Sequence, residues 1–377
     1  MKKKKVIVAM SGGVDSSVAA ALLIERGFEV VGVSMRLWDY SAFEEGGATE
    51  GSCCSLEDVY DARRVCNVLS IPFYVMNMEE AFSREVVEYF VKSYASGETP
   101  NPCVKCNEVM KFDLLLKKAV ELEADYLATG HYARIRRNDD GAYSLLKGVD
   151  AGKDQSYFLF TMTQGQLGKT LFPVGELTKE EVRQRAKGFG LAIAEKKESQ
   201  EICFIGDGDY AGFVFERTGG GVPMRSIGRG DMVTSSGEVI GTHNGLFRYT
   251  VGQRKGLDIK DGSGPYYVLG IDVRGNRLMV GGEDELFSRG LLARSLNWIN
   301  GPPREGQDVS VKIRYRHQGV SAKVTQDIGG GVEVVFSNPQ KAVAPGQAVV
   351  FYDGEVVLGG GWITKALQQG VDFYEKG

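Results

Sequence analysis

The feature that most constrains the fold is an aliphatic run, a glycine turn and an alanine-rich stretch close to the amino terminus. Residues 6–10 predict a short buried strand, and residues 16–26 predict a helix that ends at Gly27. A strand joined to a helix by so tight a turn is the first half of a β-α-β unit. The pattern therefore favours a parallel sheet with helices on its faces.

The alternation of strands and helices continues over the first half of the chain. Three further aliphatic runs predict strands, and four periodic stretches predict helices. The strands are expected at residues 30–35, 73–76 and 126–129, and the helices at residues 58–69, 79–95, 111–122 and 178–190. We therefore expect an α/β domain built on a doubly wound parallel sheet.

The second half of the chain is rich in glycine and in short β-prone runs. Five of these runs lie at residues 309–315, 320–325, 332–336, 348–352 and 355–359. Short strands separated by turn residues predict a small antiparallel barrel or sandwich. We place the α/β domain at residues 1–206, a β-rich central domain at 207–284 and a C-terminal β-barrel at 285–377.

The glycine turn is suited to binding a phosphate at the start of the first helix. Its two glycines let backbone N–H groups face an anion, and Asp15 can hold Mg²⁺ against the phosphates. Three serines add hydroxyl donors: Ser11, Ser16 and Ser17. The Gly-Lys-Ser/Thr ending of kinase and GTPase loops is absent, which excludes that class of site. A glycine-rich helix cap without a ligand is the alternative, and the flanking strand and helix argue against it.

Cys103 and Cys106 form a C-x-x-C motif, which is the second chemical signal. Two prolines precede the motif, Asn107 can cap a following helix, and a thiol at a helix N-terminus has a lowered pKa. A structural zinc half-site and two inert thiols are the alternatives, and the sequence has no second C-x-x-C to complete a zinc site. Cys203 alone would be a core cysteine, but beside a nucleotide loop and a polar C-x-x-C it is a candidate sulfur carrier.

The remaining composition argues for a cytoplasmic protein whose cysteines are thiols. The basic start of the chain is followed by only five apolar residues, too few for a signal peptide, and no apolar run approaches the ~18 residues that span a bilayer. We therefore expect no membrane partner. Cys66 lies in a helical pattern and is expected in the core, whereas Cys53 and Cys54 receive no role. None of the three histidines falls into a metal-binding spacing.

Six motifs in order resemble the tRNA-specific 2-thiouridylases, and the resemblance covers nearly the whole chain. They are Ser11-Gly12-Gly13-Val14-Asp15-Ser16, residues 99–107, Ala128-Thr129-Gly130-His131-Tyr132, Lys153-Asp154-Gln155-Ser156-Tyr157-Phe158, Cys203-Phe204-Ile205-Gly206 and residues 250–257. The first motif alone resembles only the loop of ATP pyrophosphatases, which split ATP into AMP and pyrophosphate. The set of six makes the resemblance specific.

The resemblance implies an ATP-dependent tRNA-uridine 2-sulfurtransferase, with ATP and Mg²⁺ as cofactors and the anticodon region of tRNA as partner. It implies that ATP is bound by Ala9, Met10, Ser11, Gly12, Gly13, Val14, Asp15, Ser16, Met35 and Gly130. It places the target base against Asn101, Pro102 and Cys103, and tRNA against His131, Lys153, Asp154, Gln155, Arg314, Tyr315 and Gln347. Residues 223–260 carry six basic and three acidic side chains, so a local positive patch is available although the net charge is −4.

The resemblance also implies how sulfur is transferred. ATP adenylates the C2 carbonyl oxygen of the wobble uridine, and a sulfur-donor protein or sulfide supplies the sulfur. Sulfane sulfur delivered by a sulfurtransferase is carried by Cys203 as a persulfide, and Cys106 matches the family's nucleophile. Sulfur then reaches C2 by direct attack of the persulfide, or as hydrosulfide released when Cys106 and Cys203 form a disulfide.

One position departs from the more familiar family pattern, which has aspartate where this chain has Cys103. Three thiolates at Cys103, Cys106 and Cys203 can hold a [4Fe–4S] cluster whose open iron binds hydrosulfide, so the persulfide and cluster routes both stay open. Two other functions are alternatives: an amide-forming ligase with the same loop, and a non-catalytic RNA-binding redox or iron–sulfur sensor. The three cysteines argue against the ligase, and the intact Asp15 argues against the sensor.

Overall fold

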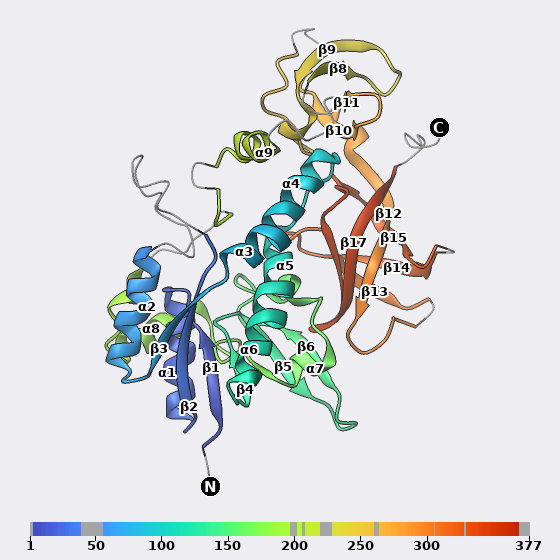
Figure 1. Ribbon diagram of the computed structural model, residues 1–377. Helices are drawn as coiled ribbons and strands as arrows, with labels where there is room; N and C mark the ends of the chain where they lie inside the picture. Colours follow the sequence, from blue (N-terminus) through green and yellow to red (C-terminus); the bar gives the residue numbers. More distant parts are fainter. Residues whose placement is uncertain are drawn as a thin grey trace.

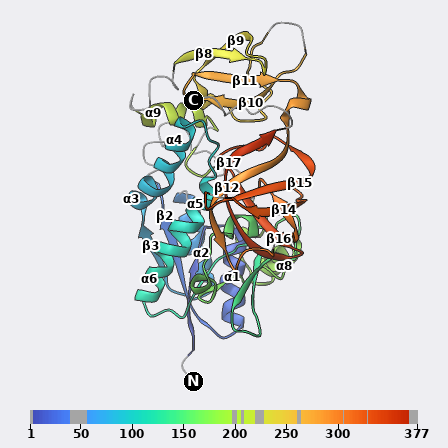
Figure 2. The same ribbon diagram turned by 90° about the vertical axis from the view of Figure 1, so that its right-hand side faces the viewer.

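A computed structural model of the chain describes residues 3–38, 56–196, 202–205, 208–218, 228–259, 264–304, 306–327 and 329–368. Figure 1 shows a parallel α/β unit at the amino-terminal end, a small sheet at the opposite end and a barrel beside them. Figure 2 shows the same order from the side, with the small sheet farthest from the amino terminus. Cys53 and Cys54 lie outside the described residues.

The α/β unit is built on a parallel sheet with strand order β3-β2-β1-β4-β7. Its strands are β1 (Lys5–Ala9), β2 (Glu29–Arg36), β3 (Phe73–Asn77), β4 (Tyr126–Ala128) and β7 (Thr170–Leu171). β1 is central, and Val6, Ile7 and Val8 are at most 1% exposed, as an aliphatic run between two helix layers requires. The sequence prediction of a parallel α/β domain is confirmed.

Helices cover both faces of this sheet. They include α1 (Val14–Glu25), α2 (Leu56–Val68), α7 (Gln164–Leu167), α8 (Lys179–Gly188) and the 3₁₀ turns η4 (Ser156–Leu159) and η5 (Ala192–Glu195). α8 packs along α1 and begins with a capping box, in which the Thr178 hydroxyl accepts from the Glu181 N–H and the Glu181 carboxylate accepts from the Thr178 N–H. The packing of α8 on α1 brings residues from the end of the α/β unit close to the glycine turn.

Two long helical segments on one side of the sheet each contain a π-helical stretch. The first comprises α3 (Glu79–Phe82), η2 (Ser83–Val87) and α4 (Glu88–Ala95), and the second comprises α5 (Pro102–Lys105), η3 (Cys106–Leu115) and α6 (Leu116–Glu121). The second segment begins nine residues before the expected start at residue 111. Asn101 is its cap and Pro102 occupies the first turn, so the prediction that Asn107 caps this helix is wrong.

The barrel is a closed antiparallel sheet. Its strands are β12 (Phe287–Trp298), β13 (Asp308–Lys312), β14 (Val320–Gln326), β15 (Val332–Lys341), β16 (Ala348–Asp353) and β17 (Val356–Gln368). Their order is β12-β15-β14-β13-β16-β17, and an additional pairing of β12 with β17 closes the ring. The predicted C-terminal β-barrel is confirmed, although the sequence pattern did not predict β12.

A hairpin from the α/β unit extends the barrel sheet. Its strands β5 (Ala133–Arg137) and β6 (Tyr143–Lys147) were not predicted, and β6 pairs with the start of β17. The largest core cluster likewise contains residues from both units, such as Ile7, Phe112 and Tyr352. The barrel is therefore joined to the α/β unit through shared hydrogen bonds and a shared hydrophobic core.

The small sheet has strand order β10-β11-β8-β9 and contacts the α/β unit through α9 (Tyr210–Thr218). Its elements are β8 (Arg229–Val233), β9 (Val239–Asn244), β10 (Tyr267–Asp272), β11 (Arg277–Gly281) and the turns η6 (Leu246–Arg248) and η7 (Glu283–Leu286). The prediction of a β-rich central part is confirmed. Over the described ranges of the chain, no helix combines the length and the apolar character needed to cross a membrane.

Candidate active site

The glycine turn lies between β1 and α1, where the carboxyl end of the central strand meets a helix N-terminus. Gly12 has φ +72°, and a Cβ there would lie 2.2 Å from the backbone oxygen of Asp58, so only glycine fits. Gly13 has extended φ and ψ and caps α1, which begins at Val14. The first turn of α1 thus presents the backbone N–H groups that a phosphate requires.

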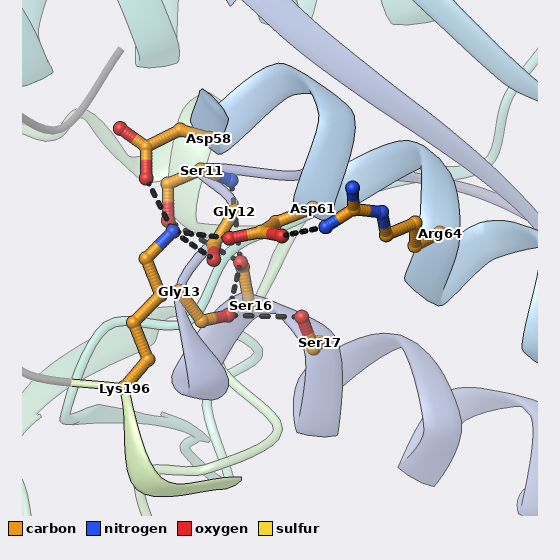
Figure 3. A network of polar contacts seen from close by, with 9 residues as sticks. All are labelled: Ser11, Gly12, Gly13, Ser16, Ser17, Asp58, Asp61, Arg64 and Lys196. Atoms are coloured by element: carbon orange, nitrogen blue, oxygen red, sulfur yellow. Dashed lines mark hydrogen bonds and ion pairs between the residues drawn. The ribbon is translucent and has the colours of Figure 1, made fainter. Parts of the chain in front are cut away.

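The serine hydroxyls of the turn bond within the turn itself. Ser16 Oγ accepts from the Ser11 N–H at 3.2 Å and lies 3.3 Å from Ser11 Oγ. Ser16 and Ser17 both donate to the Gly13 carbonyl, at 3.1 and 2.9 Å. These short-range bonds stabilise the curved backbone of the loop. Figure 3 shows the Ser16 and Ser17 hydroxyls bonded to Gly13.

A lysine and two aspartates fasten the start of the loop. Lys196 Nζ lies 2.7 Å from Asp58 Oδ1, 2.5 Å from Asp61 Oδ2 and 3.3 Å from the Gly12 carbonyl oxygen (Figure 3). Burial alone would lower the pKa of Lys196, but hydrogen bonds and charges from Asp58 and Asp61 outweigh it and raise that pKa. This network was not predicted from the sequence, because single charged residues in a polar stretch are usually solvated.

A second lysine forms an ion pair with Asp15, where the loop enters α1. Lys179, the first residue of α8, donates to Asp15 Oδ1 and Oδ2 at 2.8 and 2.9 Å. Tyr132 Oη donates to Asp15 Oδ1 at 2.7 Å. The loop has no lysine of its own, and the fold supplies Lys179 and Lys196 from distant segments.

The remaining residues expected at the nucleotide lie at or just after the carboxyl ends of β1, β2 and β4. A Cβ on Gly130 would lie 2.5 Å from the Ser16 backbone nitrogen and 2.7 Å from the Asp15 carbonyl carbon, so this glycine lets the chain after β4 touch the loop. Met35 is 8% exposed at the end of β2 and belongs to the largest core cluster. Ala9 ends β1, and the Met10 N–H donates to the Val33 carbonyl at 2.8 Å.

The C-x-x-C motif occupies the first turns of the helix that Asn101 caps. Asn101 Oδ1 accepts from the Val104 N–H at 3.2 Å, Cys103 is exposed and Cys106 is half-buried one turn later. Residues three apart on a helix share a face. The predicted target-base residues Asn101, Pro102 and Cys103 thus form one helix terminus with Cys106 behind them.

A barrel loop supports the segment that precedes this helix. Gln347 Nε2 donates to the Thr99 and Pro100 carbonyl oxygens at 3.0 and 3.2 Å, and the Thr99 N–H donates to the Pro345 carbonyl at 2.8 Å. Gln347 was expected at tRNA, and the structure places it against the backbone of Thr99 and Pro100. The barrel therefore fixes the position of Asn101.

Cys203 lies on the same side of the α/β unit as Cys106. Both half-buried thiols pack against the largest core cluster, which also holds Met35 beside the nucleotide loop. Phe204 anchors the Cys203 segment by packing on Phe82 and Phe90, with ring centroids 5.6 and 5.3 Å away. Within the ranges that the structure describes, no three His, Cys, Asp or Glu side chains gather closely enough to ligate one metal ion.

Three family profiles match the chain. They are described as a tRNA methyl transferase HUP domain (residues 4–207), a tRNA methyl transferase PRC-barrel domain (224–282) and an aminomethyltransferase beta-barrel domain (288–363). Curated relatives carry a different name, tRNA-specific 2-thiouridylase MnmA. The one from Geotalea uraniireducens is 54% identical over 97% of this chain and 96% of its own, and the one from Geobacter metallireducens is 53% identical over 98% and 99%.

The chain belongs to the tRNA-specific 2-thiouridylase family. This confirms the resemblance drawn from the six motifs. A solved 4-thiouridine synthetase–RNA complex with bound ATP is a distant likeness, 19% identical over 58% of this chain and 50% of that one, with TM-score 0.36. NMN synthetase from Francisella tularensis is 19% identical over 52% and 65%, with TM-score 0.31. The family assignment rests on the relatives and not on these two.

In this member of the 2-thiouridylase family, two residues expected at tRNA are buried. His131 is 9% exposed, its Nδ1 lies 2.6 Å from Thr129 Oγ1, and burial and then the nearby Lys111 lower its pKa, so the imidazole is neutral at pH 7. Asp154 is 5% exposed, and its Oδ1 accepts from the Gly148 and Ser156 N–H groups at 3.1 Å.

The other residues expected at tRNA lie closer to solvent. Lys153 and Gln155 are half-buried, and Gln155 Oε1 accepts from the Tyr132 N–H at 3.0 Å. Arg314 is exposed, and Tyr315 packs on Phe158 with ring centroids 4.5 Å apart. The 2-thiouridylase motif at residues 153–158 and the barrel segment at 314–315 are therefore neighbours.

Proposed function

We propose that this chain catalyses ATP-dependent 2-thiolation of the wobble uridine of tRNA. The observation that carries the proposal is that a glycine turn at the N-terminus of α1 and two thiols packed against one core cluster, Cys106 and Cys203, occur together in a chain 54% identical to a tRNA-specific 2-thiouridylase. An amide-forming ligase would use the turn but has no need of the thiols. We assign the chain to the transferases and to the cytoplasm, where tRNA is modified.

The first step is adenylation of the uracil carbonyl. The C2 oxygen attacks the α-phosphorus of ATP, the bond to the β-phosphate oxygen breaks, and pyrophosphate leaves. The resulting adenylate makes the oxygen a good leaving group as AMP. The glycine turn and the first turn of α1 bind the phosphates through backbone N–H groups, and Mg²⁺ enters as the metal of the Mg·ATP substrate.

The second step replaces oxygen by sulfur. A sulfur-donor protein transfers sulfane sulfur from its own persulfide to the Cys203 thiolate, so that Cys203 becomes a persulfide and the donor's thiol is the leaving group. Free sulfide cannot form this persulfide and can only attack C2 directly as hydrosulfide. Either the terminal sulfur attacks C2 directly, or the Cys106 thiolate attacks the Cys203 sulfur, forms a disulfide and releases hydrosulfide, which attacks C2. AMP leaves in both cases. Each route ends with a Cys106–Cys203 disulfide once the transferred sulfur has parted from Cys203, and a dithiol reductant must restore the two thiols.

The cluster alternative uses the same cysteines with Cys103 added. Thiolates are the ligands that [4Fe–4S] clusters take, and Cys103 and Cys106 lie one helical turn apart. The described side chains do not bring three such ligands together, so Cys203 would have to move toward Cys103 and Cys106 for a cluster to bind. A cluster bound there would present hydrosulfide at an open iron. Anaerobic purification followed by iron, acid-labile sulfide and visible absorbance measurements separates the two routes, because an active, colourless, iron-free enzyme excludes the cluster.

Substrate RNA approaches the exposed helix terminus and the barrel. The extruded base faces Asn101, Pro102 and Cys103. The base must leave its stack because the enzyme has to reach its C2 carbonyl. The residues proposed to contact tRNA are His131, Lys153, Asp154, Gln155, Arg314, Tyr315 and Gln347. We propose domain limits of 1–206, 207–284 and 285–377 for the catalytic, central and barrel domains.

The decisive experiment is mass spectrometry of nucleosides from tRNA incubated with the protein, Mg·ATP and a donor of sulfane sulfur. We expect 2-thiouridine, AMP and pyrophosphate in equal amounts. A Cys106→Ser variant is expected to lose thiolation, while Cys66→Ala, which removes a buried thiol in α2, is expected to retain it. Full thiolation by Cys106→Ser would refute the role of Cys106. AMP and pyrophosphate formed without 2-thiouridine would favour the ligase, and absence of AMP formation with wild-type protein would favour the non-catalytic sensor.

A further inference from the structure

Both oxygens of the Asp15 carboxylate are engaged by protein groups. Lys179 Nζ donates to Oδ1 and Oδ2 at 2.8 and 2.9 Å, and Tyr132 Oη donates to Oδ1 at 2.7 Å. Mg²⁺ binds its oxygen ligands at about 2.0–2.1 Å and requires near-octahedral space around it. An ammonium that bridges the two oxygens takes that space, so Asp15 does not fit the role of magnesium ligand.

Lys179 is held in place by contacts other than its ion pair with Asp15. Its side chain is 11% exposed and that of Asp15 is 27% exposed. Its backbone N–H donates to Asp150 Oδ2 at 2.9 Å, and it follows the capping residue Thr178. Because the lysine is already ordered, the ion pair loses less side-chain entropy than a surface pair would.

Tyr132 approaches Asp15 from a different direction. Its ring is 2% exposed, and the Lys179 ammonium lies 5.8 Å from its centroid. Two residues earlier, Gly130 touches the backbone of Asp15 and Ser16. Two separate segments, residues 130–132 and the start of α8, therefore converge on one carboxylate in the first turn of α1.

We infer that Lys179 and Tyr132 are positioning residues for ATP binding, which act by fixing and neutralising Asp15, and that Mg²⁺ reaches the site on the nucleotide and not on Asp15. The inference rests on the proposed function, because it requires the glycine turn to bind ATP. An unpaired carboxylate in this turn would repel the phosphates, and the ammonium removes that repulsion. The same contacts hold the N–H groups of α1 in register with the anion.

The test is the dissociation constant of a non-hydrolysable ATP analogue, measured once with Mg²⁺ and once with EDTA. Lys179→Met is expected to weaken binding about tenfold in both conditions, since it leaves a charge unpaired. Tyr132→Phe, which removes one hydroxyl, is expected to weaken binding about threefold. The double variant Asp15→Asn/Lys179→Met is expected to bind better than Lys179→Met, because no unpaired charge remains. Lys187→Met is the control, since Lys187 lies on the same helix with 61% of its side chain exposed.

Three outcomes would overturn the inference. One is wild-type binding by Lys179→Met. Another is an Asp15→Asn defect confined to the Mg²⁺ condition, which would make Asp15 a metal ligand. The third is a loss of affinity in the double variant that equals the sum of the losses in Asp15→Asn and Lys179→Met. Thermal unfolding shows whether each variant is folded. If Lys179→Met does not fold, the inference is tested with Tyr132→Phe, and unchanged affinity of that variant for the ATP analogue would contradict it. Failure of the wild-type chain to bind the analogue would instead overturn the proposed function itself.

Discussion

Removal of the Lys196 ammonium tests whether the loop is held by charge. In Lys196→Met, the carboxylates of Asp58 and Asp61 lose the cation that lies 2.7 and 2.5 Å from them. Their side chains are only 11% and 13% exposed, so the two anions repel each other in a partly desolvated place, although Arg64 Nη1 still lies 3.2 Å from Asp61 Oδ1. The Gly12 carbonyl loses a donor as well.

The magnitude follows from the exposure of the network. Breaking a fully buried pair costs about 3–5 kcal/mol. Lys196 keeps 29% of its side chain exposed, and solvent screening reduces that figure, so we expect a loss of about 2 kcal/mol. The direction in which the stabilisation by Lys196 changes with pH also follows from its pKa. Because the folded pKa of Lys196 is raised, its contribution is complete below the unfolded pKa of about 10.4 and is lost as pH rises through the folded value.

Hydrogen exchange by mass spectrometry measures this loss locally. Peptides from α1 and α2 should exchange about 30-fold faster in Lys196→Met at pH 7, while barrel peptides serve as the internal reference. Lys118→Met is the control, because its pair with Glu121 is 55% and 60% exposed. Adding Asp58→Asn and Asp61→Asn should restore most of the protection. Unchanged exchange in Lys196→Met, or no recovery in the triple variant, would refute the reasoning.

Three further outcomes are expected. Gly130→Ala should lower the affinity for an ATP analogue at least tenfold, measured by calorimetry, because its Cβ would lie 2.5 Å from the Ser16 backbone nitrogen, which cannot yield. Gln347→Ala should lower tRNA thiolation about 2- to 10-fold while ATP affinity stays at the wild-type value, since only the bonds to the segment at Thr99 are lost. Cys66 should resist alkylation by iodoacetamide at pH 8 until the protein is unfolded, as shown by peptide mass spectrometry, because burial raises the pKa of its thiol to about 11.

The parallel sheet was predictable because its strands are aliphatic on both faces. The expected strand at residues 6–10 is β1 (Lys5–Ala9), and the one at 30–35 is β2 (Glu29–Arg36). Both predictions are confirmed within the usual error at element ends. The hairpin of β5 and β6 was missed although its strands pair with each other across a short turn, because β5 carries three arginines and is not an aliphatic run. The strand that attaches β6 to the barrel is β17, which lies about two hundred residues later in the chain. Such a partner leaves no local signal.

The site was predictable only where chemistry depends on adjacent residues. Two glycines in a turn after a strand predict a phosphate-binding loop, and two closely spaced thiols indicate sulfur chemistry. Lys179 and Lys196 are single lysines in charged surroundings, and periodicity assigns such residues to a solvated face. Only tertiary packing of α8 on α1, and of the residues after η5 on the loop, turns them toward the phosphate site.

Residues 153–158 show how a motif can serve RNA through packing. The Asp154 carboxylate lies 3.7 Å from Lys312 Nζ at the end of β13, and it is 4% exposed. Two residues beyond Lys312, Arg314 and Tyr315 begin the exposed barrel segment, and Tyr315 packs on Phe158. Asp154 therefore connects the α/β unit to the barrel at the point where two segments proposed to contact tRNA meet. Under the proposed function, we expect Asp154 to affect tRNA binding through this junction as well as through its own contact, because its ion pair with Lys312 joins the segments that carry Lys153 and Arg314.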